Sequence, residues 1–321
     1  MFDRTQWFLA GMSIALSVQL SQPVAAAVPV GQAVQTAQNS SSDAALKALN
    51  EGLQLYYQGT IESFKGALVK YEQALNLYRE AGDRAKEAVT ISNIGLVYSD
   101  LGETQTALGY YNQSLLLSRA VGDREQEAIT LNNIGLIYSN LGEPPKALEY
   151  YNQSLPLSRA TGNRSQEAVT LSNIGLVYSN LGEPQKALEY YNQSLPLSRA
   201  IGNPGREALT LNNIGKIYED IGEKQKALDY YNQSLPLSRA AGNRSQEAVT
   251  LNKIGLVYSD LGEKQKALEY FSQSLPLSRA VGDRSKEAIT LNNIGLVYSD
   301  LGEKQKALEY FSQSLPLSRA V

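Results

Sequence analysis

Carboxamide and ammonium groups recur along the chain at a spacing of forty residues, and this row is the part of the sequence best suited to chemistry. Five of its positions carry asparagine and one carries lysine, namely Asn93, Asn133, Asn173, Asn213, Lys253 and Asn293. A further lysine, Lys216, follows Asn213 by three residues. Because carboxamides pair with peptide groups and ammonium groups pair with carboxylates, the row points to recognition of a polypeptide.

The composition excludes most other functions. The 321 residues include no cysteine and no histidine, with 29 basic and 32 acidic side chains. Disulfides, zinc sites with Cys or His ligands, and nucleophile pairs that use either residue are therefore excluded. The sequence has no glycine-rich phosphate loop and no nucleophile elbow, so we expect neither an enzyme nor a cofactor. With a net charge of -3, nucleic acid is not an expected partner.

Residues 1–27 are typical of a secretory signal peptide. An apolar run of twelve residues, 7–18, is shorter than the roughly 20 residues that a stable membrane span needs, and Ala25-Ala26-Ala27 supplies small residues for cleavage. We therefore expect export to the periplasm or the extracellular side of the cell envelope, with no stable membrane span. An uncleaved anchor is the alternative, because Asp3 offsets the charge of Arg4. Residues 28–41 show no apolar period and are predicted to be a linker.

The remainder of the chain is a repeat with a period of forty residues. Each unit opens on glycine followed by Asp or Asn, as in Gly82-Asp83, which is the pattern of a helix end and the cap of the next helix. A second break at Gly102 divides the unit, so we predict helix A at about 84–101 and helix B at about 104–120. The predicted solenoid, residues 42–321, has the units 42–81, 82–121, 122–161, 162–201, 202–241, 242–281 and 282–321.

The helical period places a core face on both helices. At 100° per residue, the apolar and small residues of the second unit fall within one arc of each helix. In helix A these are Ala88, Ile91, Ile94, Gly95, Tyr98 and Leu101, and in helix B they are Ala107, Leu108, Tyr111, Ser114 and Leu115. A single hairpin of this size buries too little apolar surface to be stable, so neighbouring units must stack.

The spacing of the core residues resembles the tetratricopeptide repeat (TPR). In the last unit its pattern is met by Gly295, Tyr298, Gly302, Ala307, Phe311 and Ser314. The resemblance implies an all-α fold, a right-handed α-solenoid of seven helix-turn-helix units whose helices A line a concave, peptide-binding side. The period of forty rather than 34 residues is similar to the repeats of kinesin light chains and of many cyanobacterial proteins.

A stripe of mixed character lies opposite the core face of helix A. In the second unit it comprises Val89, Asn93, Leu96 and Asp100, and a purely solvated face would not carry two aliphatic residues. The resemblance implies that its asparagine contacts the bound backbone, whereas recent duplication of a neutral residue is the alternative. The predicted peptide-binding groove consists of Asn50, Val89, Asn93, Leu96, Asn133, Leu136, Asn173, Leu176, Asn213, Lys216, Lys253, Leu256, Asn293 and Leu296.

The two lysines of this stripe interrupt the pattern. Lys216 replaces a leucine and Lys253 replaces an asparagine on adjacent helices A, so the pair could hold an acidic side chain or a C-terminal carboxylate. The carboxylate clamp of chaperone-binding TPR proteins also needs Lys and Asn in the preceding unit. That unit has Ser172 and Leu176 at these positions, so the clamp is not intact.

The two ends of the solenoid differ. In the first unit, Glu51 takes the core position of Ile94, which suits a polar terminal repeat. In the last unit, no polar helix follows Val321, so Tyr310 and Leu317 are expected to be exposed. Either the chain continues or this end pairs with something, possible partners including another copy. The main hypothesis is therefore a non-enzymatic scaffold for a protein or peptide partner, and the alternative is a structural solenoid that self-assembles through its C-terminal end.

Overall fold

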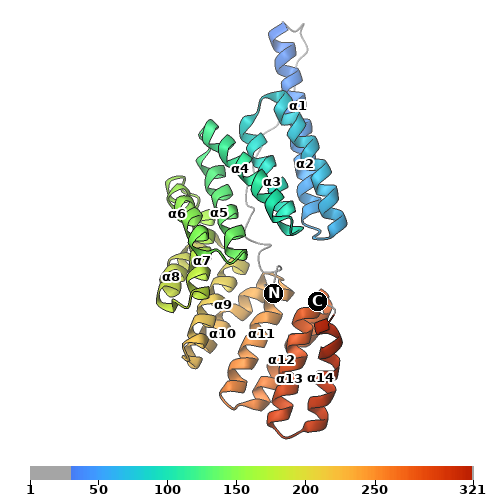
Figure 1. Ribbon diagram of the computed structural model, residues 1–321, viewed down its shortest axis with the longest axis vertical. Coiled ribbons are helices and arrows are strands. Elements are labelled where there is room, and N and C mark those ends of the chain that lie inside the picture. Colours follow the sequence, from blue (N-terminus) through green and yellow to red (C-terminus); the bar gives the residue numbers. More distant parts are fainter. Residues whose placement is uncertain (1–29, 320–321) are drawn as a thin grey trace. The chain divides into compact units, whose positions relative to one another are not determined.

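The computed structural model describes residues 30–319, which form fourteen helices and no strand (Figure 1). The helices are α1 (Val30–Tyr56), α2 (Ile61–Ala81), α3 (Arg84–Asp100), α4 (Thr104–Val121), α5 (Arg124–Asn140), α6 (Pro144–Ala160), α7 (Arg164–Asn180), α8 (Pro184–Ile201), α9 (Pro204–Asp220), α10 (Lys224–Ala240), α11 (Arg244–Asp260), α12 (Lys264–Val281), α13 (Arg284–Asp300) and α14 (Lys304–Arg319). The odd-numbered helices are the predicted helices A and the even-numbered ones are the helices B. The all-α prediction is confirmed.

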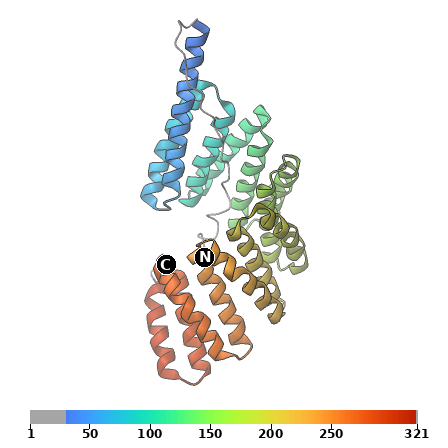
Figure 2. The same cartoon turned by 180° about the vertical axis from the view of Figure 1, so that it is seen from behind.

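The described chain divides into two compact units between Asn173 and Ile174, inside α7. In the unit of residues 30–173, α1 packs on α2, α3 on α4 and α5 on α6, and α2 and α4 also contact the helix A that follows them. In the unit of residues 174–319, α9 packs on α10, α11 on α12 and α13 on α14 in the same way (Figure 2). Both units are therefore built by stacking helical hairpins.

The junctions between hairpins follow from their sequence. Gly82 ends α2 with φ 71°, a left-handed conformation that costs glycine little. Asp83 then accepts a hydrogen bond from the backbone N–H of Lys86 at 3.1 Å, which caps α3. Gly102, with φ 80°, makes the second turn of the unit. These residues recur every forty positions, so the helix boundaries recur with them.

Each hairpin closes around one glycine and one aromatic ring. A Cβ added to Gly95 would lie 3.0 Å from the ring of Tyr111 on the paired helix, so only glycine permits this approach. Ser114, on the same helix as Tyr111, donates a hydrogen bond of 2.8 Å to the carbonyl of Ala88. The sequence assigned all four residues to the core, and all four are buried.

The first unit departs from the prediction at its start. The linker was predicted to span residues 28–41, yet α1 begins at Val30, so residues 30–41 are helical. Glu51 is half-buried and forms an ion pair of 2.5 Å with Lys70. The predicted signal peptide, residues 1–27, lies outside the described residues. Within residues 30–319, no helix is both long and apolar enough to cross a membrane.

Recurring ion pairs connect the end of each helix B with the start of the next helix A. Arg84 and Glu87, three residues apart on α3, form an ion pair at 3.0 Å. The recurring partner, however, is the arginine eight residues before each glutamate, at the end of the preceding helix B. These pairs are Arg79–Glu87, Arg119–Glu127, Arg159–Glu167, Arg199–Glu207, Arg239–Glu247 and Arg279–Glu287.

Candidate functional site

The predicted groove residues lie along the row of helices A, where neighbouring helices cover most of them. α3 contacts α5 in the first unit, and α11 contacts both α9 and α13 in the second. Two groove residues, Asn50 and Leu296, are exposed, and Asn173 and Asn293 are buried. The half-buried ones are Val89, Asn93, Leu96, Asn133, Leu136, Leu176, Asn213, Lys216, Lys253 and Leu256.

Two asparagines of the row bind the preceding helix A. Asn173 Nδ2 donates to Asn132 Oδ1 at 3.1 Å, and Asn293 Nδ2 donates to Asn252 Oδ1 at 2.9 Å. Their exposed fractions are only 3% and 9%. The prediction that the stripe faces away from the packing is therefore wrong at these two positions, because a helix A has neighbours on its flanks as well as on its core face. Their contact with a bound peptide stays a prediction.

A second row of asparagines lies one position earlier, and sequence reasoning missed it. Asn212 Nδ2 donates to Thr250 Oγ1, and Asn252 Nδ2 donates to Thr290 Oγ1, both at 2.7 Å across neighbouring helices A. The signal was present in the sequence as Asn at a spacing of forty residues. A helical wheel that assigns one buried face to each helix does not predict this second row. With the first row, these residues form an amide ladder, by which we mean the bonds of Asn132, Asn173, Asn212, Asn252 and Asn293.

Two amide atoms of these rows are buried without a partner, and in each case the neighbouring helix A carries a different residue at the partner position. Asn93 Nδ2 is buried without a partner, and α1 carries Leu49 at the position that corresponds to Asn132. Asn212 Oδ1 is likewise buried without a partner, and α11 carries Lys253 where α13 carries Asn293. An unpaired buried amide group destabilises a fold by about 1–3 kcal/mol. The replacements at these positions therefore cost stability.

Lys253 does not fill the position that asparagine leaves. Its Nζ lies 5.5 Å from the ring centre of Tyr231, whose hydroxyl donates to Glu219 Oε2 at 2.5 Å. Burial lowers the pKa of Lys253 to about 8, although the carboxylates of Glu219 and Asp220 oppose this shift. At neutral pH the Lys253 ammonium therefore lies on the face of the Tyr231 ring, and with this pKa it loses its proton in mildly alkaline solution.

Lys216 has a partner of its own on α9. It pairs with the carboxylate of Asp220, one turn later on the helix. Lys216 and Lys253 are therefore each engaged on their own side, Lys216 by a carboxylate and Lys253 by a ring. That the two lysines together hold a carboxylate of a partner stays a prediction.

Stacked tyrosines mark the turn of every regular hairpin, a feature that the sequence did not reveal. Tyr98 and Tyr110 stack with ring centres 5.4 Å apart and an interplanar angle of 10°. The same stack recurs in the pairs Tyr138–Tyr150, Tyr178–Tyr190, Tyr218–Tyr230, Tyr258–Tyr270 and Tyr298–Tyr310. Because each ring covers the other, these stacks stabilise the turns.

Comparisons with known proteins agree with this architecture. A profile of the tetratricopeptide repeat matches residues 62–120, 86–160, 166–240 and 246–320. No curated protein matches the chain in sequence.

Solved structures share the fold at low sequence identity. Aspartyl phosphate phosphatase F from Bacillus subtilis is 15% identical with a TM-score of 0.66, over 90% of this chain and 74% of that one. A Rap protein complexed with competence and sporulation factor is 15% identical with a TM-score of 0.63, over 85% and 74%. BtubC (BKLC) from P. vanneervenii is 17% identical with a TM-score of 0.58, over 78% and 93%. The profile matches more than half of the residues, and the chain belongs to the tetratricopeptide repeat family.

Proposed function

We propose that this chain is a non-enzymatic scaffold that is exported to the cell envelope and holds an extended segment of a partner protein along its helices A. The observation that carries the proposal is the row of half-buried leucines along these helices. Leu96, Leu136 and Leu256 are half-buried, so each combines apolar surface with access to solvent. An extended segment needs such apolar contacts beside groups that pair with its backbone.

One structural relative supports binding of another molecule on this fold. The Rap protein was solved in complex with competence and sporulation factor, and it shares the fold with this chain at 15% identity. The likeness supports a scaffold and carries no information on the partner of this chain, since binding residues do not follow from a fold.

A peptide array probed with the full chain tests the proposal. We expect a set of extended segments to bind, and we expect the double variant Leu136→Ser, Leu256→Ser to lose at least tenfold in affinity. The matched control is Leu116→Ser, because Leu116 is an exposed leucine on a helix B. Thermal unfolding of all variants shows whether they are folded. Unchanged binding by the folded double variant, or equal loss in the control, contradicts the groove.

A second candidate function, self-association, is favoured by the C-terminal hairpin. The predicted exposed residues, Tyr310 and Leu317, are half-buried, but Leu296, Leu308 and Leu315 of α13 and α14 are exposed. Leucine at the matching position of α10, Leu228, is buried by the next hairpin. The exposed leucines thus form an apolar surface of the kind that a following hairpin covers elsewhere in the chain.

The first helix does not suit this surface. It exposes Lys47, Asn50 and Gln54 at positions where α3 carries Thr90, Asn93 and Val97. We therefore propose that two C-terminal hairpins pair with each other around a twofold axis, rather than with α1 of another copy. Light scattering of the full chain should show a dimer that Leu296→Glu with Leu308→Glu dissociates and Leu116→Glu leaves intact. A monomer at all concentrations, or open-ended growth, contradicts this candidate.

A further inference from the structure

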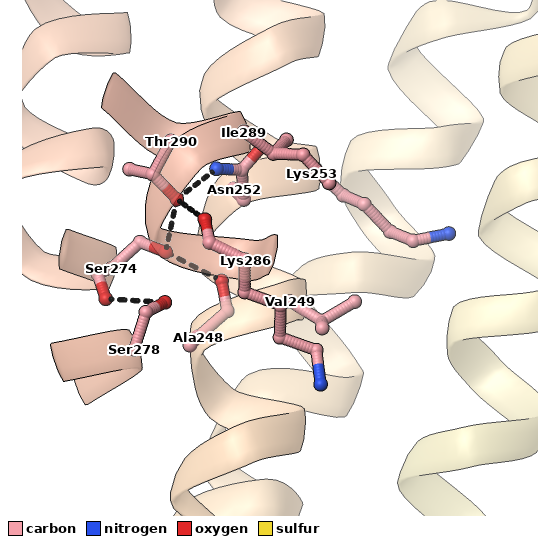
Figure 3. Close-up of a pocket in the computed structure, with 9 residues that line it drawn as sticks. All are labelled: Ala248, Val249, Asn252, Lys253, Ser274, Ser278, Lys286, Ile289 and Thr290. Atoms are coloured by element: carbon pink, nitrogen blue, oxygen red, sulfur yellow. Dashed lines mark hydrogen bonds between the residues drawn. The ribbon is translucent and has the colours of Figure 1, made fainter. Parts of the chain in front are cut away.

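A pocket of about 220 Å³ lies between α11, α12 and α13 in the second unit (Figure 3). Its lining comprises Ala248, Val249, Asn252, Lys253, Ser274, Ser278, Lys286, Ile289 and Thr290. This volume is many times the roughly 15 Å³ that a single water needs, so a side chain can enter. Val249 is half-buried and Ile289 is 52% exposed, which gives the pocket an apolar rim at the surface.

Earlier repeats fill the equivalent space with their own glutamine. Gln126 Nε2 donates to Thr130 Oγ1 at 3.0 Å and lies 3.5 Å from Ser114 Oγ. Gln166 Nε2 likewise donates to Thr170 Oγ1 at 3.2 Å. Thr290 and Ser274 occupy the positions of Thr130 and Ser114, and both line the pocket. The pocket therefore occupies the place of a carboxamide. Gln246 of α11 departs from this pattern and donates to the carbonyl of Gly205 at 3.2 Å.

The pocket exists because Lys286 stands where Gln126 and Gln166 stand in their repeats. Lys286 is 8% exposed, and its ammonium donates to Ser245 Oγ at 2.8 Å and to Asp283 Oδ2 at 2.7 Å. Figure 3 shows this ammonium pointing away from Thr290 and Ser274. The hydroxyl groups of these two residues thus lack the carboxamide that binds their counterparts.

The free hydrogen-bonding capacity of the pocket is that of an acceptor. Ser274 Oγ donates its proton to the carbonyl of Ala248 at 2.8 Å, and Thr290 Oγ1 donates its proton to the carbonyl of Lys286 at 2.9 Å. Asn252 uses one lone pair of Thr290 Oγ1. The two hydroxyl oxygens lie 3.5 Å from each other, and the lone pairs that remain on them can accept hydrogen bonds from an N–H donor.

The geometry points to a binding site for the primary carboxamide of a glutamine side chain from a partner segment. Its N–H group donates to Ser274 Oγ and Thr290 Oγ1, as Gln126 does in the third repeat, and its methylene groups lie between Val249 and Ile289. A carboxylate has no N–H to offer, and a lysine would bring a second ammonium beside Lys286. This inference rests on the proposed function in one respect only, namely that a partner protein supplies the glutamine side chain.

Methyl NMR of the full chain tests the site with small probes. Resonances of Val249 and Ile289 are followed while N-acetyl-glutamine N-methylamide is added, and the glutamate analogue is the comparison. We expect saturable shifts with the glutamine probe and at least tenfold weaker binding of the glutamate probe. Lys286→Gln should abolish the shifts, because the new side chain fills the pocket as Gln126 fills its own. Lys47→Gln, the same change on the surface of α1, should leave them intact.

The outcomes separate this inference from the proposed function. Equal affinity for the two probes, no shifts at high probe concentration, or undiminished binding by folded Lys286→Gln overturns the carboxamide site. The comparison of probes needs no variant, so a folding defect does not obscure it. If array segments bind the chain while the probe does not, the scaffold proposal is supported and the carboxamide site is contradicted. If the probe binds saturably but no segment binds, the carboxamide site is supported and the scaffold proposal is contradicted.

Discussion

Asn293 Nδ2 lies 2.9 Å from Asn252 Oδ1, so a residue expected to face a ligand instead joins two neighbouring helices A. Asn252 in turn donates to Thr290 at 2.7 Å, and Thr290 lies on α13 together with Asn293. Both polar atoms of the Asn252 carboxamide are thereby satisfied by α13. The amide ladder therefore stabilises the fold, and from its bonds we predict how single substitutions change the free energy of unfolding.

Replacing Asn293 with alanine should destabilise the chain by about 1–3 kcal/mol, because Asn252 Oδ1 stays buried and loses its donor. Urea unfolding followed by circular dichroism measures the change. Asn50→Ala is the matched control, since Asn50 is exposed on α1, and we expect less than about 0.5 kcal/mol there. Equal effects at the two positions would show that the ladder bond contributes nothing.

Replacing Lys253 with asparagine should stabilise the chain by about 1 kcal/mol. The new carboxamide can donate to Asn212 Oδ1, which is buried and unpartnered, as Asn293 donates to Asn252 Oδ1. Lys253→Ala separates this effect from mere loss of the ammonium, because alanine offers no donor. The prediction fails if asparagine is no more stable than alanine in urea unfolding.

The pKa of Lys253 predicts a pH dependence of stability. Burial lowers this pKa from about 10.5 to about 8, so between these values the unfolded chain binds more protons than the folded one. The contribution of Lys253 to the free energy of unfolding should therefore rise with pH through this window, by roughly 1–3 kcal/mol. Tyrosines of the unfolded chain begin to titrate at about pH 9.5 and act in the opposite direction, so the quantity to measure from pH 7.5 to 9.5 is the difference between this chain and a variant that lacks Lys253. A Lys253→Met variant should lack the rise, and an identical slope in both proteins would refute the assignment.

Close packing of glycine against the aromatic ring makes opposite predictions for two glycines. Gly215→Ala places a Cβ 2.6 Å from the ring of Tyr231 and should destabilise by about 1–3 kcal/mol. Gly109→Ala, on the outer side of α4, meets no atom within 4 Å and should stabilise by about 0.5–1 kcal/mol. Thermal unfolding of both variants checks the difference in sign. A loss of stability in both would mean that helix propensity and packing are not the causes.

The periodic residues made the helices predictable, while the neighbours of each helix were not. Gly82 and Asp83 set the start of α3 at Arg84, as the sequence predicted, because cap and turn residues act locally. The ladder depends on residues about forty positions apart, so a wheel drawn for one helix could not distinguish a flank covered by the next hairpin from a free face. That is why Asn173 and Asn293 were placed in the groove. Residues 30–41 were missed because their only apolar side chains are small ones, Val30, Ala33, Val34 and Ala37, among glutamine, threonine, asparagine and serine.

Lys253 and Lys286 have a consequence for how a partner would be positioned. An array of near-identical hairpins offers an extended ligand several equivalent alignments, each shifted by one hairpin from the last. These two lysines stand on consecutive helices A, α11 and α13, and no other pair of neighbouring helices A among the described residues carries lysine at both positions. Such local irregularity would give the proposed ligand one preferred alignment, and a shift by one hairpin would then lose binding energy.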